Sequence, residues 1–315
     1  MAGVLNGFAV IVALVALGWV LGRTGVLGND ARLVLNRLVF FVATPALLFD
    51  SLARTTLDQV FTGVFVVSAV SALIVAVIYM IIARLWLRTP APDLVVGAMS
   101  AGYVNSANLG IPIALYVLGD MGFVMPLLLF QVVILQPFAI AVLERTANPD
   151  GAVGGGEGGG AWGALLQSVR TPIVLAALAG FGVAATPWSL PDIVLEPVHL
   201  VGQISVPGAL LVFGMSLYGV KVFEAGASPR REIGLASGLK LVAHPLLAYA
   251  IGAWALGMSG HDLLTVVVAA ALPTAQNVLV VATRYNRGVL LARDSAVLTT
   301  LGALPVLLLI SALLA

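Results

Sequence analysis

Long apolar stretches without charged residues recur along the whole chain. Runs such as residues 64–82 are almost continuously apolar and lack the alternation expected of barrel strands. In lipid, a segment of this kind must pair its backbone polar groups internally, and helices do so. The pattern therefore predicts an all-α polytopic membrane protein with ten transmembrane helices, at about residues 4–22, 33–49, 60–83, 94–118, 121–143, 171–190, 193–219, 233–257, 263–283 and 295–315.

Composition supports a lipid environment. Of the 315 residues, 61% are hydrophobic and only 9% are charged, and mean hydropathy is +1.10. A soluble domain is about half apolar and about a quarter charged. These values exclude a soluble enzyme, a disordered chain and a nucleic-acid binder with a basic face. The chain has no cysteine, which excludes disulfides and thiol catalysis. We expect no cofactor and no metal.

The basic residues predict the orientation of the helices. Residues 1–22 contain no Lys or Arg, so the first apolar run is typical of a membrane helix rather than of a signal peptide. With the N-terminus outside, 14 of the 15 basic residues fall on the cytoplasmic side, and only Arg54 falls outside. We therefore expect a multi-pass protein of the cell membrane with both termini extracytoplasmic.

A glycine-rich segment at residues 146–161 divides the chain near its midpoint. Such a segment is typical of a flexible linker. It separates a first half, residues 1–145, from a second half, residues 162–315, and each half holds five predicted helices. Weak ordered similarities relate the halves, for example Asp93 to Asp262 at the start of the fourth and ninth helices. Because five is odd, the second half must be inverted in the membrane, as in many secondary transporters.

The fourth and ninth predicted helices each contain a cluster of small, polar and helix-breaking residues. Both clusters lie 11–15 residues or slightly more after Asp93 or Asp262, so they reach about 17–22 Å into a core that is ~30 Å thick. Proline interrupts the helical hydrogen bonding there. The residues that we expect to form a substrate site are Asn105, Ser106, Asn108, Gly110, Pro112, Pro273, Thr274, Gln276 and Asn277.

A broken helix leaves N–H groups unpaired at the start of its second half, and such groups attract anions. No carboxylate lies in either cluster. The site therefore suits a small organic anion better than a cation. The alternative is structural, with these polar groups bonding between helices or replacing backbone bonds lost at proline. An intramembrane enzyme, a channel and a transporter-fold sensor are less well supported, because no catalytic set, charged ring or additional domain is evident.

At these residues the sequence resembles the auxin efflux carrier family of membrane transporters, which includes the plant PIN-type carriers and bacterial members. The matching stretches are NSANLGIP at 105–112 and ALPTAQNVLVVATRYN at 271–286, and the likeness extends over nearly the whole chain. The second motif departs from the plant pattern after Pro273, which argues against auxin itself as the substrate.

The resemblance implies a fold like that of the sodium/bile-acid symporters, with helices 4 and 9 crossing at Pro112 and Pro273. Helices 1, 2, 6 and 7 would form a scaffold, through which a homodimer could form, and helices 3–5 and 8–10 would move in an elevator-like manner. The implied function is transport of an organic acid, either auxin-like or a dicarboxylate, with Asn105 at the position that contributes to substrate binding. Coupling to sodium or protons stays open.

Few other polar groups lie within the predicted helices. We expect Lys240 to extend to the inner membrane surface; the alternative is a fixed positive charge near the crossing that replaces a coupling cation. His244, beside Pro245, is expected to be a packed side chain, with a proton-sensitive group as the alternative. Asp50 is expected to be solvated. Gln131 either lines the cavity or bonds to a neighbour, and the same holds for Gln136.

Overall fold

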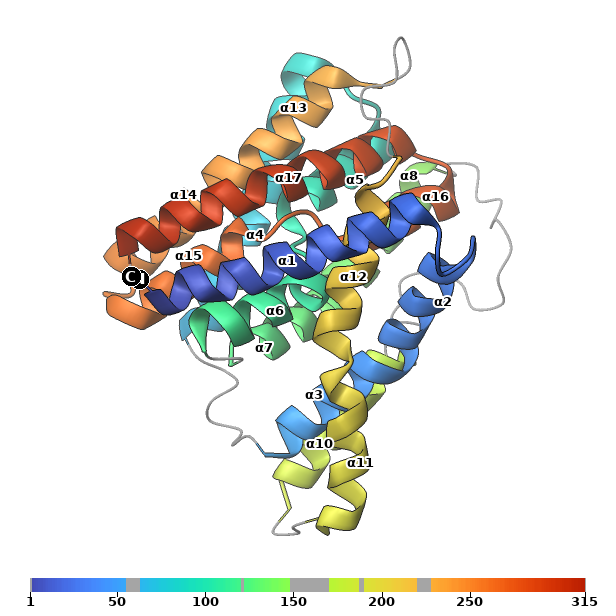
Figure 1. The fold of residues 1–315 in the computed structure, drawn as a ribbon. Coiled ribbons are helices and arrows are strands. Elements are labelled where there is room, and N and C mark those ends of the chain that lie inside the picture. Colours follow the sequence, from blue (N-terminus) through green and yellow to red (C-terminus); the bar gives the residue numbers. More distant parts are fainter. Residues whose placement is uncertain are drawn as a thin grey trace. The chain divides into compact units, whose positions relative to one another are not determined.

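The computed structural model of the chain describes residues 2–54, 63–119, 122–147, 170–186, 190–219 and 228–314. Within these ranges the structure is helical, with an isolated β-bridge and no longer β-strand (Figure 1). Each of the ten predicted stretches is helical over most of its described length. Most of the predicted glycine-rich linker, residues 148–161, lies outside the described residues.

Among the described residues, six helical segments are long and apolar enough to cross a membrane. They are Ala31–Ala53, Gly63–Leu87, Pro126–Leu143, Asp192–Leu217, Arg230–Ala255 and Val289–Leu314. Four shorter apolar helical segments accompany them, at Ala9–Thr24, Ser106–Leu118, Pro172–Ala184 and Gly260–Ala271. The protein is therefore an all-helical polytopic membrane protein, as the pattern of apolar residues predicts.

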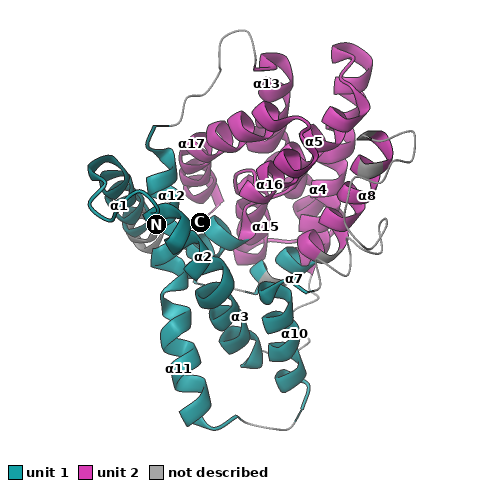
Figure 2. Cartoon of the chain, turned by 90° about the vertical axis from the view of Figure 1, so that its right-hand side faces the viewer, with its two compact units in different colours: residues 1–62, 107–129, 168–220 teal, residues 63–106, 130–167, 221–315 magenta. Residues whose placement is uncertain are grey.

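The chain divides into two compact units, each assembled from both halves of the sequence (Figure 2). Unit 1 comprises residues 1–62, 107–129 and 168–220. Its helical elements are α1 (Ala2–Thr24), α2 (Ala31–Leu38), η1 (Val39–Ala43), α3 (Thr44–Ala53), η4 (Ser106–Gly110, from its second residue), α6 (Ile111–Ile113), η5 (Ala114–Leu118), α7 (Val124–Leu129), α10 (Pro172–Ala184), α11 (Asp192–Gln203) and α12 (Ser205–Leu217).

Close helix packing in unit 1 depends on glycine. Helix α1 runs alongside α12, and α3 packs against α10 and α11. A Cβ atom at Gly18 of α1 would collide with the carbonyl oxygen of Leu211, and one at Gly214 of α12 would collide with that of Val15. Glycine at these positions lets the two backbones approach, as is common between helices in membranes.

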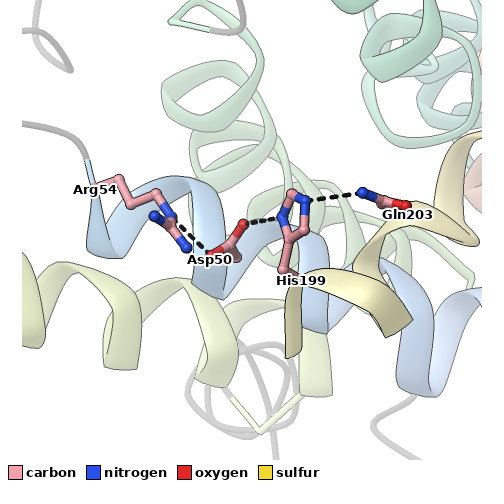
Figure 3. A network of polar contacts seen from close by, with 4 residues as sticks. All are labelled: Asp50, Arg54, His199 and Gln203. Carbon is pink, nitrogen blue, oxygen red and sulfur yellow. Dashed lines mark hydrogen bonds and ion pairs between the residues drawn. The ribbon is translucent and has the colours of Figure 1, made fainter. Parts of the chain in front are cut away.

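A polar network joins α3 to α11 within unit 1 (Figure 3). One oxygen of Asp50 accepts a hydrogen bond from Arg54 Nε at 2.9 Å, and the other lies 2.8 Å from His199 Nδ1. His199 Nε2 is in turn 2.8 Å from Gln203 Nε2. Asp50 is only 6% exposed, so the prediction of a solvated residue is wrong. The partners on the neighbouring helix and one turn along its own helix make its burial tolerable.

Unit 2 comprises residues 63–106, 130–167 and 221–315. A core cluster that includes Val96, Met99, Ile140, Val278 and Ala292 joins four of its helices. Its helical elements are α4 (Gly63–Ile82), η3 (Ala83–Leu87), α5 (Ala91–Gly102), η6 (Phe130–Leu135), α8 (Gln136–Ala147), α13 (Arg230–Gly238), η7 (Leu239–Ala243), α14 (His244–Ala250), η8 (Ile251–Ala255), α15 (Gly260–Ala271), α16 (Gln276–Tyr285) and α17 (Val289–Leu314).

Candidate functional site

The fourth predicted helix is interrupted. Helix α5 ends at Gly102, and Tyr103 takes an extended conformation with φ −83° and ψ 112°. Val104 and Asn105 continue as non-helical backbone, and helical structure resumes at Ser106 with the π-helical turn η4. The prediction of a break in this helix is confirmed.

The ninth predicted helix is interrupted in a similar way. Helix α15 ends at Ala271, and α16 begins at Gln276. The four residues between them, Leu272 to Ala275, are non-helical, and Ala275 is extended with φ −70° and ψ 144°. Pro273 has no backbone N–H and disfavours a helical conformation at Leu272, which explains why the helix ends there.

The two interruptions pair with each other inside unit 2. Val104 and Thr274 face each other in an antiparallel β-bridge. The N–H of Asn105 donates to the Pro273 carbonyl at 2.8 Å, and the N–H of Ala275 donates to the Tyr103 carbonyl at 3.2 Å. Backbone groups that each helix loses at its break are therefore satisfied by the other break, as burial requires. We refer to residues 103–105 together with 273–275 as the crossing.

Side chains from two other helices satisfy the outward-facing N–H groups of the crossing. The N–H of Val104 donates to Gln131 Oε1 at 2.7 Å, and the N–H of Thr274 donates to Thr299 Oγ1 at 3.0 Å. Gln131 also donates from Nε2 to Ser106 Oγ at 2.9 Å. Of the two roles open for Gln131 in the sequence, the structure shows the bond to a neighbour. Gln136 likewise accepts a hydrogen bond from the Tyr103 hydroxyl at 3.1 Å.

Pro112 does not lie at the crossing. It belongs to α6, which follows η4 without a gap, and its position is seven residues beyond Asn105. The prediction that the first helix crosses at Pro112 is therefore wrong. Pro112 stands in the first turn of α6, directly after the π-helical turn η4, where proline is tolerated, so helical structure continues through it. The break falls instead where Gln131 and the Pro273 carbonyl take over the backbone N–H groups of Val104 and Asn105.

The predicted site residues differ in burial and in the hydrogen bonds that their side chains make. Thr274 is buried, and its hydroxyl donates to the Ser100 carbonyl at 2.6 Å, so this side chain supports the crossing. Ser106 is buried against Gln131. Asn105 is 4% exposed, whereas Gln276 and Asn277 are half-buried at the start of α16. Asn108, Gly110 and Pro112 belong to unit 1, and Asn108 is half-buried.

Lys240 and His244 lie in the interior of unit 2. Lys240 is 0% exposed, and its Nζ is 3.0 Å from Nδ1 of His244, which is 1% exposed. The expectation that Lys240 extends to the inner surface is therefore wrong. Its position on η7, enclosed by α4, α5, α15 and α17, leaves its side chain no path along an exposed helix face. Within the described residues no group of three or more metal-ligating side chains occurs.

Sequence reasoning missed three residues that hold the crossing: Ser100, Tyr103 and Thr299 each bond to it or belong to it. Thr299 also donates to the Ser295 carbonyl at 2.7 Å, which directs its oxygen lone pair toward Thr274. Single hydroxyl side chains in apolar helices usually bond to their own preceding turn, so nothing in the pattern distinguishes Thr299 from Thr300.

Interrupted helices that pair at their breaks inside a membrane protein are typical of secondary transporters. Comparison with known proteins shows the family: residues 4–149 and 163–311 match the family described as "Membrane transport protein", and the chain belongs to it, in agreement with the resemblance to auxin efflux carriers. The protein is therefore a membrane transporter and not an enzyme.

Relatives from bacteria and archaea have transporter names. A protein of Rhizobium meliloti named "Putative malonate transporter" is 28% identical over 298 residues, which cover 91% of this chain and 88% of the relative. An "Uncharacterized transporter" of Methanothermobacter thermautotrophicus is 28% identical over 296 residues, 92% of both chains. The transporter YfdV of Escherichia coli is 25% identical over 283 residues, covering 88% of this chain and 86% of YfdV.

Proposed function

We propose that the protein is a secondary carrier that moves a small carboxylate anion across the cell membrane by alternating access. The observation that carries this proposal is the crossing, where two interrupted helices exchange backbone hydrogen bonds through Val104 and Thr274. Non-helical backbone within a membrane protein is tolerated where it is buried in protein or lines a cavity, and in secondary transporters it marks the substrate site.

Several features of the two breaks correspond, as we would expect of inverted repeats. Helices α5 and α15 both have 12 residues and both carry an acid, Asp93 or Asp262, in their first turn. At each break an outward N–H donates to a side chain further along the chain. Val104 donates to Gln131, 27 residues later, and Thr274 donates to Thr299, 25 residues later. This correspondence supports ten spans arranged as two inverted five-helix repeats, residues 1–145 and 162–315, joined by the glycine-rich segment 146–161.

The chemistry of the crossing favours an anion. Helical segments begin at Ser106 and at Gln276, and each presents the positive end of its helix dipole there. Of the first N–H groups, that of Ser106 donates to the Val104 carbonyl at 2.9 Å and that of Val278 donates to the Ala275 carbonyl at 3.2 Å. Such ends attract negative charge. The amides of Asn105, Gln276 and Asn277 add neutral donors, whereas residues 103–110 and 272–277 contain no carboxylate. We therefore place the substrate at Asn105, Gln276 and Asn277, which all belong to unit 2.

A short dicarboxylate is the substrate class that we favour. The name of the Rhizobium meliloti relative indicates malonate, and similarity covers most of both chains. Two carboxylates fit a site with two helix starts better than one carboxylate does. An auxin-like monocarboxylate is the second candidate, because the chain belongs to the same family as the auxin carriers.

The division into units supports an elevator-like scheme. Of the ten predicted transmembrane helices, the first, second, sixth and seventh fall in unit 1, which would be the scaffold, and the third and the eighth to tenth fall in unit 2, which would move. The fourth and fifth, which the scheme assigns to the moving part, are divided between the units at residues 106–107 and 129–130. The breaks that pair, at residues 103–105 and 273–275, both belong to unit 2 and would travel with it. A homodimer through scaffold helices, and extracytoplasmic termini in the plasma membrane, complete the proposal.

Uptake into proteoliposomes tests the proposal. Purified protein is reconstituted, and uptake of radiolabelled malonate is compared with that of succinate, acetate and indole-3-acetate. We expect saturable malonate uptake that unlabelled malonate accelerates from the inner side, because exchange is the signature of a carrier. Asn105→Ala and Gln276→Ala should reduce it, whereas Asn36→Ala, an exposed asparagine on α2, should not. Unsaturable flux, or equal flux in all variants, would contradict a carrier with its site at the crossing.

A further inference from the structure

A lysine and a histidine form an isolated polar pair in the interior of unit 2. Lys240 Nζ and His244 Nδ1 are 3.0 Å apart, and both side chains are almost completely buried. His244 Nε2 is buried and has no hydrogen-bond partner among the described residues. A buried cation is normally compensated by an anion. Within the described part of the chain, however, Lys240 makes no ion pair with a carboxylate.

The helix that carries the pair packs against helices α5, α15 and α17, which carry or contact the crossing. Leu241, the residue after Lys240, is the neighbour that a Cβ on Gly302 would meet first, and Gly302 is one turn beyond Thr299 on α17. Thr299 accepts the hydrogen bond from the N–H of Thr274. One turn before Lys240, Ala236 packs in a core cluster with Ala98 and Ala101 of the last turns of α5.

The elements packed against η7 carry few groups that could neutralise the pair. Asp294 is held by Ser228 and Arg293, each at 2.8 Å. Asp93 interacts with Arg287 and with the N–H of Gly288. The other titratable or charged residues on α4, α13, α14, α15 and α17 are Tyr79, Arg230, Arg231, Glu232, Tyr249, His261 and Asp262; Tyr79 shares the cluster of Ala236, and His261 and Asp262 are exposed.

We propose that Lys240 and His244 together form a single-proton site, and that its occupation compensates the charge of the anion bound at the crossing. Two positive charges at this separation repel strongly where water is excluded, so the pair holds one proton or none. With one proton, the ammonium of Lys240 donates to Nδ1 of His244, and Nε2 carries the imidazole hydrogen. With none, the Lys240 amine is neutral and the interior holds no uncompensated charge.

Coupling between anion binding and protonation of the Lys240–His244 pair follows from this arrangement. An anion at the crossing stabilises the protonated pair, and a protonated pair attracts the anion, because linkage is reciprocal. The proton enters from the side where the site is open, and it leaves to the other side after the anion dissociates. Transport would therefore move one proton with each anion. This inference rests on the proposed function and selects proton coupling over sodium coupling.

Transport in sodium-free proteoliposomes with the membrane voltage clamped tests the coupling. Malonate influx and an internal pH dye are recorded together, from about pH 5.5 to pH 8.5, where histidine chemistry changes. In the wild type, influx should acidify the lumen. Lys240→Met, an apolar replacement of similar length, should abolish the pH dependence and the proton signal per malonate transported, and it should slow malonate exchange because the charge that attracts the anion is lost. His261→Gln, at an exposed histidine of the same unit, should keep both. Unchanged proton movement in Lys240→Met would overturn the proposal.

A substrate-free measurement separates this inference from the proposed function. The chain has three histidines, so His199→Gln combined with His261→Gln leaves His244 as the only one for selective ¹⁵N labelling. The Nδ1 signal should show a hydrogen bond from Lys240, and the pair should titrate in one coupled step. Lys240→Met should abolish that bond and change the titration. An imidazole spectrum and titration that are identical with and without Lys240 would refute the single-proton site, even if malonate is not transported.

Discussion

Gln131 is predicted to be the side chain on which the crossing depends most. It is 1% exposed and makes two hydrogen bonds, accepting from the N–H of Val104 and donating to Ser106 Oγ. Gln131→Met keeps the volume but leaves the Val104 N–H buried without its acceptor. An unpaired buried donor costs about 1–3 kcal/mol, and with the lost bond to Ser106 we expect about 2–4 kcal/mol less unfolding free energy.

The loss can be measured by equilibrium unfolding in mixed micelles, and uptake assays would report its effect on the substrate site. Gln203→Met is the matched control, because Gln203 is exposed and, among the described residues, its amide contacts His199. It should change stability by less than about 0.5 kcal/mol. Thr299→Val, which removes the acceptor of the Thr274 N–H, should resemble Gln131→Met, because the two side chains have equivalent roles at the crossing.

A difference near zero between the unfolding free energies of Gln131→Met and Gln203→Met would refute the role given to Gln131. If Gln131→Met and Gln203→Met unfold at the same free energy, the Val104 N–H must find another acceptor or water. The crossing would then be hydrated rather than held by side chains.

The remaining predictions concern unit 1. Gly214→Val should reduce stability by about 3 kcal/mol or more, because its side chain would collide with the α1 backbone, and thermal unfolding in detergent would reveal this. Gly182→Ala, where a Cβ meets nothing within 4 Å, should be neutral or gain up to about 1 kcal/mol in the same assay. Asp50→Asn should cost about 1–2 kcal/mol because Asp50 is buried with two partners, as unfolding titrations would show. Arg54→Gln should cost less than about 0.5 kcal/mol because the Arg54 side chain is 56% exposed; equal losses in the two variants would contradict this assignment.

Much of the fold was accessible from the apolar pattern. The ten predicted stretches are helical over most of their described residues, because a run of about 20 apolar residues has no other way to satisfy its backbone in lipid. The breaks in the fourth and ninth stretches were also accessible, because Pro273 and the small polar residues around Asn105 act locally on the backbone. The prediction at Pro112 failed because proline weakens a helix without always ending it. There the helix continues from the π-helical turn η4 into α6.

The sequence by itself determined which segments are helical, where two of them are weakened, and that the protein resides in a membrane, since these depend on local backbone chemistry and apolar content. Tertiary structure alone decided which polar groups meet. Nothing near Gln131 in the sequence indicates that it caps the Val104 N–H, and nothing near Lys240 indicates burial rather than extension to the surface. Partners in such contacts come from distant helices, so their pairing is a property of packing and not of any local pattern.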